Sequence, residues 1–173
     1  MQLGLDDATW GRRNNPDCEA NVAALIAAWR SAGRPVVFVR HDSVLADSPL
    51  RPNQPGNDFK PVVAGEPDLL VSKQVNSAFF GEPDLHDWLQ DRGITGVAIS
   101  GIQTNYCCET TARMAGNLGY DTLFVLDATY TFDLPAHGGG VITADELARV
   151  TASNLQDEFA DVVMTADLVE GRG

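Results

Sequence analysis

Two adjacent cysteines, Cys107 and Cys108, stand where a predicted strand passes into a predicted helix. At a helix N-terminus, unpaired backbone N–H groups and the helix dipole favour a thiolate and lower the pKa of a cysteine. A thiolate is a nucleophile, and the same N–H groups could stabilise the oxyanion formed when it attacks a carbonyl carbon. Most free cysteines are small buried hydrophobic residues, so position alone leaves packing open as the alternative. A disulfide between neighbours is strained and disfavoured.

Lys73 is the second residue with possible chemistry, because it ends an apolar strand where a solvated charge is not expected. Beside a thiol, a partly desolvated ammonium would lower the pKa of the thiol and stabilise developing negative charge. The alternative is a surface lysine whose stem lies along apolar neighbours. Two phenylalanines follow, Phe79 and Phe80, and they are either walls of a small apolar pocket or core residues.

The three histidines are weaker candidates. His41 lies in an irregular loop beside Arg40, His86 in a surface helix and His137 in a glycine-rich turn, so each is expected to be a solvated polar residue rather than a catalytic base. No pair of histidines has the spacing of a zinc site. We therefore predict neither a metal nor another cofactor.

Apolar runs alternate with helical patterns along the chain, which predicts an α/β fold with a Rossmann-like parallel sheet between two helical layers. Such sheets place their sites at the carboxyl ends of the strands. The predicted strands are 35–40, 69–73, 96–100, 122–127 and 161–165, and the predicted helices are 15–33, 84–93, 108–119 and 143–160. A long loop, His41–Gly65, should form a lid or an interface arm, and residues 170–173 a frayed tail.

Bulk properties predict a single domain over residues 1–173 and narrow its partners. Twenty-four acidic against 12 basic residues give a formal net charge of −12, which disfavours nucleic acid and anionic membranes as partners. No apolar run is long enough for a membrane span and no signal peptide is evident, so a cytoplasmic location is expected. The odd number of cysteines favours reduced thiols.

The segments "KQVNSAF", "GIQTNYCCETTARMAGNLGY" and "VLDATYTFD" resemble the isochorismatase-like cysteine hydrolases, which include nicotinamidases and N-carbamoylsarcosine amidohydrolases. The resemblance runs from about Asp6 to Val163. It implies a three-layer α/β/α fold and an Asp–Lys–Cys triad that hydrolyses small amides through an acyl-enzyme. Cys107 matches the nucleophile and Lys73 the lysine, whereas Cys108 falls where the family usually carries an apolar residue.

The resemblance also assigns roles to the turn before Cys107. In the family this "GIQT" turn carries a non-proline cis peptide and backbone donors for the oxyanion, which correspond here to Ile102, Gln103 and the N–H of Cys107. Trp10, Phe79 and Tyr106 are the predicted walls of the substrate pocket. Homo-oligomers are common in the family, so one is expected here.

The N-terminus departs from the family pattern, which begins with an apolar strand ending in aspartate. Met1 and Gln2 match the residues just after that aspartate, so the first strand and the general base are expected before Met1. Asp6 and Asp7 are poor substitutes because they follow the strand end by a turn or more.

The expected function is hydrolysis of a small-molecule amide. A pyridine carboxamide ranks below other amides, because only His41 is available for the metal site that nicotinamidases carry. Two alternatives stay open: a catalytically silent member that binds a small molecule or serves as an oligomeric scaffold, and, less favoured, a thiol redox protein.

Overall fold

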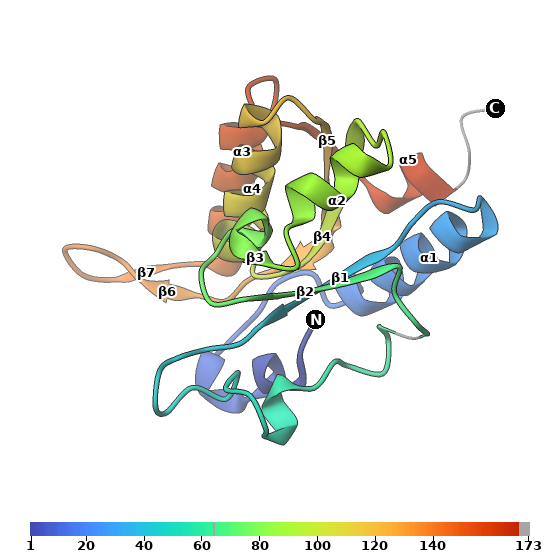
Figure 1. The fold of residues 1–173 in the computed structure, drawn as a ribbon. Coiled ribbons are helices and arrows are strands. Elements are labelled where there is room, and N and C mark those ends of the chain that lie inside the picture. Colours follow the sequence, from blue (N-terminus) through green and yellow to red (C-terminus); the bar gives the residue numbers. More distant parts are fainter. Residues whose placement is uncertain (64, 170–173) are drawn as a thin grey trace.

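The computed structural model describes residues 1–63 and 65–169, arranged as parallel strands between two helical layers (Figure 1). The principal strands are β1 (Val37–His41), β2 (Leu69–Lys73), β4 (Gly96–Ile102), β5 (Asp121–Tyr130) and β8 (Asp161–Val163). The helices are α1 (Cys18–Ser31), α2 (Leu85–Asp91), α3 (Glu109–Asn117), α4 (Ala144–Leu155) and α5 (Thr165–Val169). The predicted α/β fold is confirmed. The predicted tail lies outside the described residues.

The principal strands form two sheets rather than the single predicted sheet. One has the order β1-β2-β3, with β3 at Gly81–Glu82, and the other has the order β4-β5-β8. Pairing is parallel between β1 and β2, β4 and β5, and β5 and β8. Within the described residues no strand ladder joins β1 to β4. Each of these two strands therefore has one edge without a strand partner.

A side chain takes the place of a strand partner at the end of β1. The Gln2 amide accepts a hydrogen bond from the His41 N–H at 2.8 Å and donates one to the His41 carbonyl at 3.0 Å. Next to it, the Lys60 N–H donates to the Met1 carbonyl at 3.0 Å. The Gln2 side chain thus lies at the open edge of β1, and Met1 pairs with the long loop.

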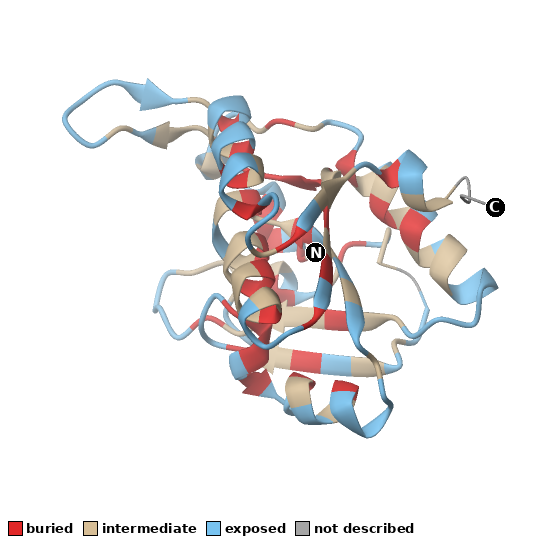
Figure 2. Cartoon of the chain, turned by 90° about the horizontal axis from the view of Figure 1, so that it is seen from above, coloured by how far each residue is buried: buried red, intermediate tan, exposed pale blue. Residues whose placement is uncertain are grey.

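The core lies on both faces of β5, because successive strand side chains point to opposite sides. Phe124 is fully buried against Ala112 of α3 and Leu155 of α4. Val125, its neighbour, is buried against α1 in the cluster that contains Val22. Leu25, one turn further along α1, is buried in the same cluster. Buried residues follow the strands and inner helix faces in Figure 2.

Several predicted boundaries were wrong. The helix predicted from residue 15 begins at Cys18. Asn15 has a φ of 44°, and its side-chain amide donates to the carbonyls of Leu126 and Thr129. β4 and β5 extend beyond their predicted ends. β8 is shorter, because Thr165 already begins α5. α4 ends at Leu155, shortly before Asp157 takes a left-handed φ of 65°.

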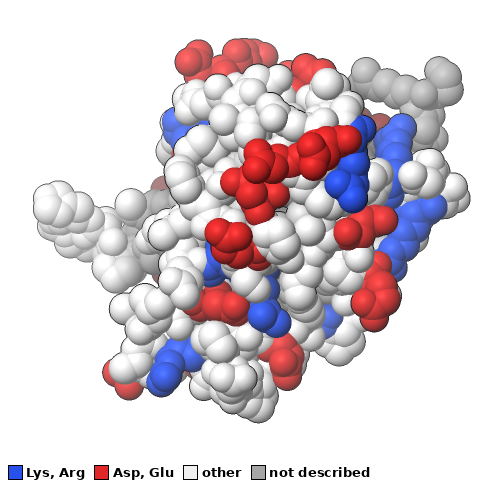
Figure 3. All heavy atoms as spheres, in the orientation of Figure 1, with Lys and Arg blue, Asp and Glu red and all other residues white. Residues whose placement is uncertain are grey.

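Three features concern the surface. A short hairpin of β6 (Leu134–Pro135) and β7 (Val141–Ile142) projects from the body (Figure 2). Acidic side chains predominate on the face shown in Figure 3, as the net charge of −12 requires. In the described part of the chain, no helix is long and apolar enough to cross a membrane.

Candidate active site

Cys107 and Lys73 come together at the carboxyl ends of β2 and β4. Lys73 is the last residue of β2, and Cys107 lies in the π-helical turn Thr104–Cys108 that follows β4. The Lys73 Nζ is 3.2 Å from the Cys107 Sγ, and the Asn76 Oδ1 is 3.8 Å from the same sulfur. A buried ammonium at the end of one sheet therefore faces a partly exposed thiol at the end of the other.

The Lys73 ammonium has three protons and three acceptors. Besides the Cys107 Sγ, its Nζ lies 3.0 Å from the Val75 carbonyl and 3.3 Å from the His41 Nδ1. An ammonium can only donate, so a charged Lys73 requires His41 to accept through an unprotonated Nδ1. These contacts fix the direction of the ammonium, which is only 5% exposed.

His41 is the residue that the sequence interpretation misplaced. It ends β1, where its register partner is Lys73, and its side chain is half-buried rather than solvated in a loop. Burial lowers the pKa of His41, the charge of Lys73 lowers it further, and Asp42 opposes both. The imidazole is therefore neutral at neutral pH, as its role as an acceptor requires.

The other two cysteines are not available for the same chemistry. Cys108 is 5% exposed and packs against Ala112 and Phe124, which confirms the predicted inward position. Burial raises the pKa of Cys108, and it raises the pKa of the fully buried Cys18 to about 12. Both stay protonated thiols at neutral pH.

The turn before Cys107 is held by hydrogen bonds to the end of β5. The Thr104 hydroxyl donates to the Thr129 hydroxyl at 2.9 Å, and the Thr131 hydroxyl donates to the Asn105 side chain at 2.5 Å. The Ile102–Gln103 peptide is cis, as the resemblance implies. These bonds fix the turn from which Cys107 projects.

Of the predicted oxyanion donors, Cys107 lies in this turn, Gln103 directly precedes it and Ile102 ends β4. The Gln103 carbonyl accepts from the N–H groups of Tyr106 and Cys108, at 3.3 Å and 3.1 Å. The assignment of oxyanion donors to Ile102, Gln103 and Cys107 stays a prediction.

The three predicted pocket residues lie in different surroundings. Phe79 is 8% exposed and stacks on Tyr120, so it belongs to the core and forms no exposed wall. The Trp10 indole donates to the Gly4 carbonyl at 2.8 Å and its ring stacks on Phe132. Only Tyr106, next to Cys107, is exposed.

A groove that the sequence did not reveal lies beside Cys107. It is bounded by the segment 74–80 after β2 and by the first turns of α3, and it encloses about 510 Å³. Phe80, 66% exposed, forms part of its wall in place of the buried Phe79.

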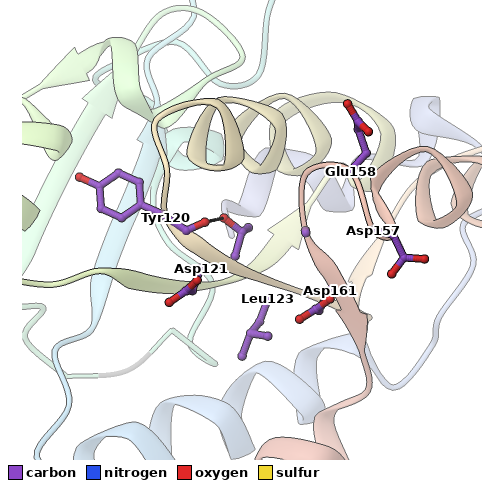
Figure 4. A pocket seen from close by; sticks show the side chains of 8 residues that line it. Tyr120, Asp121, Leu123, Asp157, Glu158 and Asp161 are labelled. Atoms are coloured by element: carbon purple, nitrogen blue, oxygen red, sulfur yellow. Dashed lines mark hydrogen bonds between the residues drawn. The ribbon is translucent and has the colours of Figure 1, made fainter.

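A second hollow, of about 300 Å³, lies at the opposite ends of β5 and β8 (Figure 4). Four carboxylates line it, with Asp121 and Asp161 on the strands and Asp157 and Glu158 on the turn after α4. It is lined by no cysteine and lies at the amino ends of the strands, away from Cys107. Neither these carboxylates nor any other His, Cys, Asp and Glu side chains in the described part of the chain form a group of three or more that could hold a metal ion.

Comparison with known proteins identifies a family. The family model of the isochorismatase domain matches residues 1–165. The isochorismatase family protein YrdC of Bacillus subtilis is 34% identical over 170 residues, which cover 98% of this chain and 90% of that protein. Nicotinamidase 3 of Arabidopsis thaliana is 32% identical, with coverage of 83% of this chain and 73% of that protein.

Solved structures of similar sequence have the same fold. A crystal structure of a hydrolase of the isochorismatase family from Chromobacterium violaceum superposes with a TM-score of 0.93 at 39% identity, covering 98% of this chain and 88% of that one. A cysteine hydrolase from Pseudomonas syringae gives a TM-score of 0.86 at 25% identity, with coverage of 98% and 87%.

Proposed function

Because this chain belongs to the isochorismatase family of hydrolases, we propose that it is a cysteine hydrolase that cleaves a small-molecule amide through a thioester on Cys107. The observation that carries the proposal is the 3.2 Å contact between the Lys73 ammonium and the Cys107 sulfur. A cation at this distance stabilises the thiolate over the thiol. Cys107 is also the most accessible of the three cysteines.

The proposed reaction has two stages. The Cys107 thiolate attacks the amide carbon, and the carbonyl oxygen becomes an oxyanion held at the Ile102–Cys107 turn. The C–N bond then breaks, the nitrogen leaves with an added proton, and the acyl group stays on sulfur. Water attacks the thioester, which releases a carboxylate and restores the thiol. Lys73 stays protonated throughout.

The first stage needs a group that accepts the thiol proton. Among the described residues, no carboxylate forms a hydrogen bond with Cys107; its partners are Lys73 and Asn76. We expect the acceptor to be a carboxylate at the open edge between β1 and β4, in the role that the resemblance gives to the aspartate at the end of the family's first strand.

The test compares four proteins: the chain as given, the chain extended before Met1 by a short apolar segment that ends in Asp, the same extension ending in Asn, and the Asp-ended protein with Cys107→Ala. Ammonia release from a panel of primary amides is measured, and the acyl-enzyme is trapped by acid quench and weighed. We expect turnover in the Asp-ended protein, a loss of at least about a thousandfold in the Asn-ended one, and no adduct in the alanine variant. Equal rates with Asp and Asn would refute a carboxylate base.

One observation favours a second candidate function. Since no described carboxylate contacts Cys107, the chain would serve as a small-molecule binder without catalysis if no base reaches the thiol. Binding of amides by all four proteins, with no ammonia and no adduct from any of them, would identify this function.

A further inference from the structure

We propose that the groove beside Cys107 binds the uncharged, apolar part of the substrate, so that the preferred substrates are small neutral amides with a short aliphatic or aromatic group. This inference rests on the proposed function, because it assigns the substrate class to the same site. It concerns the residues after β2 and on α3.

The groove adjoins the nucleophile through Asn76, although Cys107 itself is not one of its lining residues. Cys107, Thr110 and Met114 are spaced by three and four residues, which places them along one side of the helical stretch that runs from the π-turn into α3. Thr110 and Met114 line the groove, and Asn76 lines it opposite while its Oδ1 lies 3.8 Å from the Cys107 sulfur. A substrate whose carbonyl meets the sulfur can therefore extend a substituent along α3.

The lining of the groove carries no charge. Its apolar part consists of Val75, Phe80 and Met114, and its remaining side chains are neutral amides and hydroxyls. This composition contrasts with a chain in which 21% of the residues are charged. The volume of about 510 Å³ lies in the range of small-molecule sites, roughly 300–1,000 Å³.

The exposed apolar side chains and the lack of charge specify the occupant. Val75 is 50% exposed and Phe80 is 66% exposed, so an apolar group placed against them would remove their surface from water. A charged group in the same place would lose hydration without gaining a partner. The ammonium of Lys73 provides no such partner, because its protons are directed to His41, Val75 and Cys107.

The test uses three methanethiosulfonates of similar size: a neutral propyl, a cationic aminoethyl and an anionic sulfonatoethyl reagent. The rate of Cys107 modification is followed by intact mass and divided by the rate for a free thiol peptide. We expect the propyl reagent to be favoured by about tenfold over both charged reagents. Cys107→Ser provides the blank.

Two pairs of variants locate the effect. Phe80→Ser should reduce the propyl preference severalfold, whereas Val150→Ser, which changes an exposed residue of α4, should leave it unchanged. Thr110→Lys should make the anionic reagent the fastest, whereas Val150→Lys, with the same added charge, should not. Circular dichroism checks that all variants fold.

Four results would overturn the inference: equal normalised rates for the three reagents, preferences that survive both groove variants, a Cys107 that no reagent modifies, or rates that fall with protein concentration because a second copy fills the groove. A failure of this inference can be distinguished from a failure of the proposed function. Labelling with the expected preference but no amide hydrolysis by the Asp-ended protein contradicts the proposed function alone, and hydrolysis that prefers anionic amides contradicts the groove alone.

Discussion

Cys107 and Cys108 are adjacent in sequence, but their side chains lie in different surroundings. The Cys107 sulfur faces the Lys73 ammonium and is partly exposed, whereas Cys108 packs beneath α3. Burial destabilises a thiolate, and a nearby ammonium stabilises one. The two thiols should therefore differ in reactivity by far more than their shared sequence position suggests.

This difference predicts the alkylation pattern. At pH 7 in native buffer, iodoacetamide should modify one thiol per chain, at Cys107. The Cys107→Ala variant should take up no label over the same time, whereas Cys18→Ala should be labelled like the parent because the pKa of Cys18 is about 12. Peptide mapping by mass spectrometry identifies the labelled cysteine. Label at Cys108 in the folded protein would contradict the arrangement.

His41 predicts how the site responds to acid. Burial and Lys73 keep the pKa of His41 below its ordinary value, with Asp42 acting against them. Above that pKa the neutral Nδ1 accepts from Lys73; as the pH falls through it, the ring becomes a cation and the contact is lost. His41→Ala should slow Cys107 alkylation by about tenfold and remove a step in the rate below pH 6.5.

His41→Asn is the matched control for this prediction, because its amide oxygen can take the place of Nδ1 as an acceptor. It should retain most of the alkylation rate at neutral pH and also lack the acid step. An alanine variant with the parent's complete pH profile would show that His41 does not position Lys73.

At the level of elements, a partly buried ion network joins the long loop to α1 and β5. Lys60, in the loop, is 4% exposed, and its Nζ lies 2.9 Å from Glu19 on α1 and 3.0 Å from the Tyr130 hydroxyl on β5. Arg13 binds both oxygens of Glu19 at 2.6 Å. The carboxylate of Glu19 therefore pairs with both cations, of which Lys60 also pairs with Asp6.

The network predicts an acid-sensitive stability. The Arg13 guanidinium, with the Lys60 ammonium, lowers the pKa of Glu19 to about 2, although burial acts in the opposite direction. The folded pKa is depressed, so the contribution is present above the unfolded value near 4.5 and is lost as the pH falls toward 2. Because Glu19 is only partly buried and solvent screens the pair, Glu19→Gln should cost about 1–2 kcal/mol at pH 7 and less at pH 3.

Urea unfolding at both pH values measures this difference. Glu158→Gln serves as the control, because Glu158 lies on the exposed turn after α4. A Glu19→Gln penalty that is the same at pH 7 and pH 3 would contradict the assignment.

The elements differ in how far the sequence could predict them. β2 was predicted at its observed bounds, because its apolar run is short and ends at Lys73. The last residues of β5 were not predicted. Thr129 and the adjacent Thr131 are buried polar residues, and their hydrogen bonds cannot be read from the hydrophobic pattern of the sequence. The end of α4 was predicted too late, because the left-handed turn at Asp157 interrupts a sequence that still has helical periodicity.

The site was predicted only in part, for a similar reason. Cys107 and Lys73 follow apolar strands, so the rule that sites form at strand ends brings them together. His41 was missed because its strand was ended one residue too early. Gln2 was missed because its bonds to His41 join residues 39 positions apart, and no local pattern records such a contact.

For the whole molecule, the division into two sheets should appear in backbone protection. β5 is paired on both sides, by β4 and β8, whereas β1 is paired with β2 alone in the described residues. At the edge of β1 that faces away from β2, the Gln2 side chain is the acceptor for the His41 N–H. Backbone amides exchange with solvent when their hydrogen bonds open locally, and singly paired strands open more readily.

Hydrogen–deuterium exchange by mass spectrometry should therefore show β5 protected about tenfold longer than β1 or more. Gln2→Ala should speed exchange in the peptide that contains His41 and leave the β5 peptide unchanged, because only the first loses an acceptor. Gln54→Ala is the control, since its amide bonds to the Ser48 carbonyl within the long loop. Equal protection of β1 and β5 would mean that a strand already covers the edge beside His41.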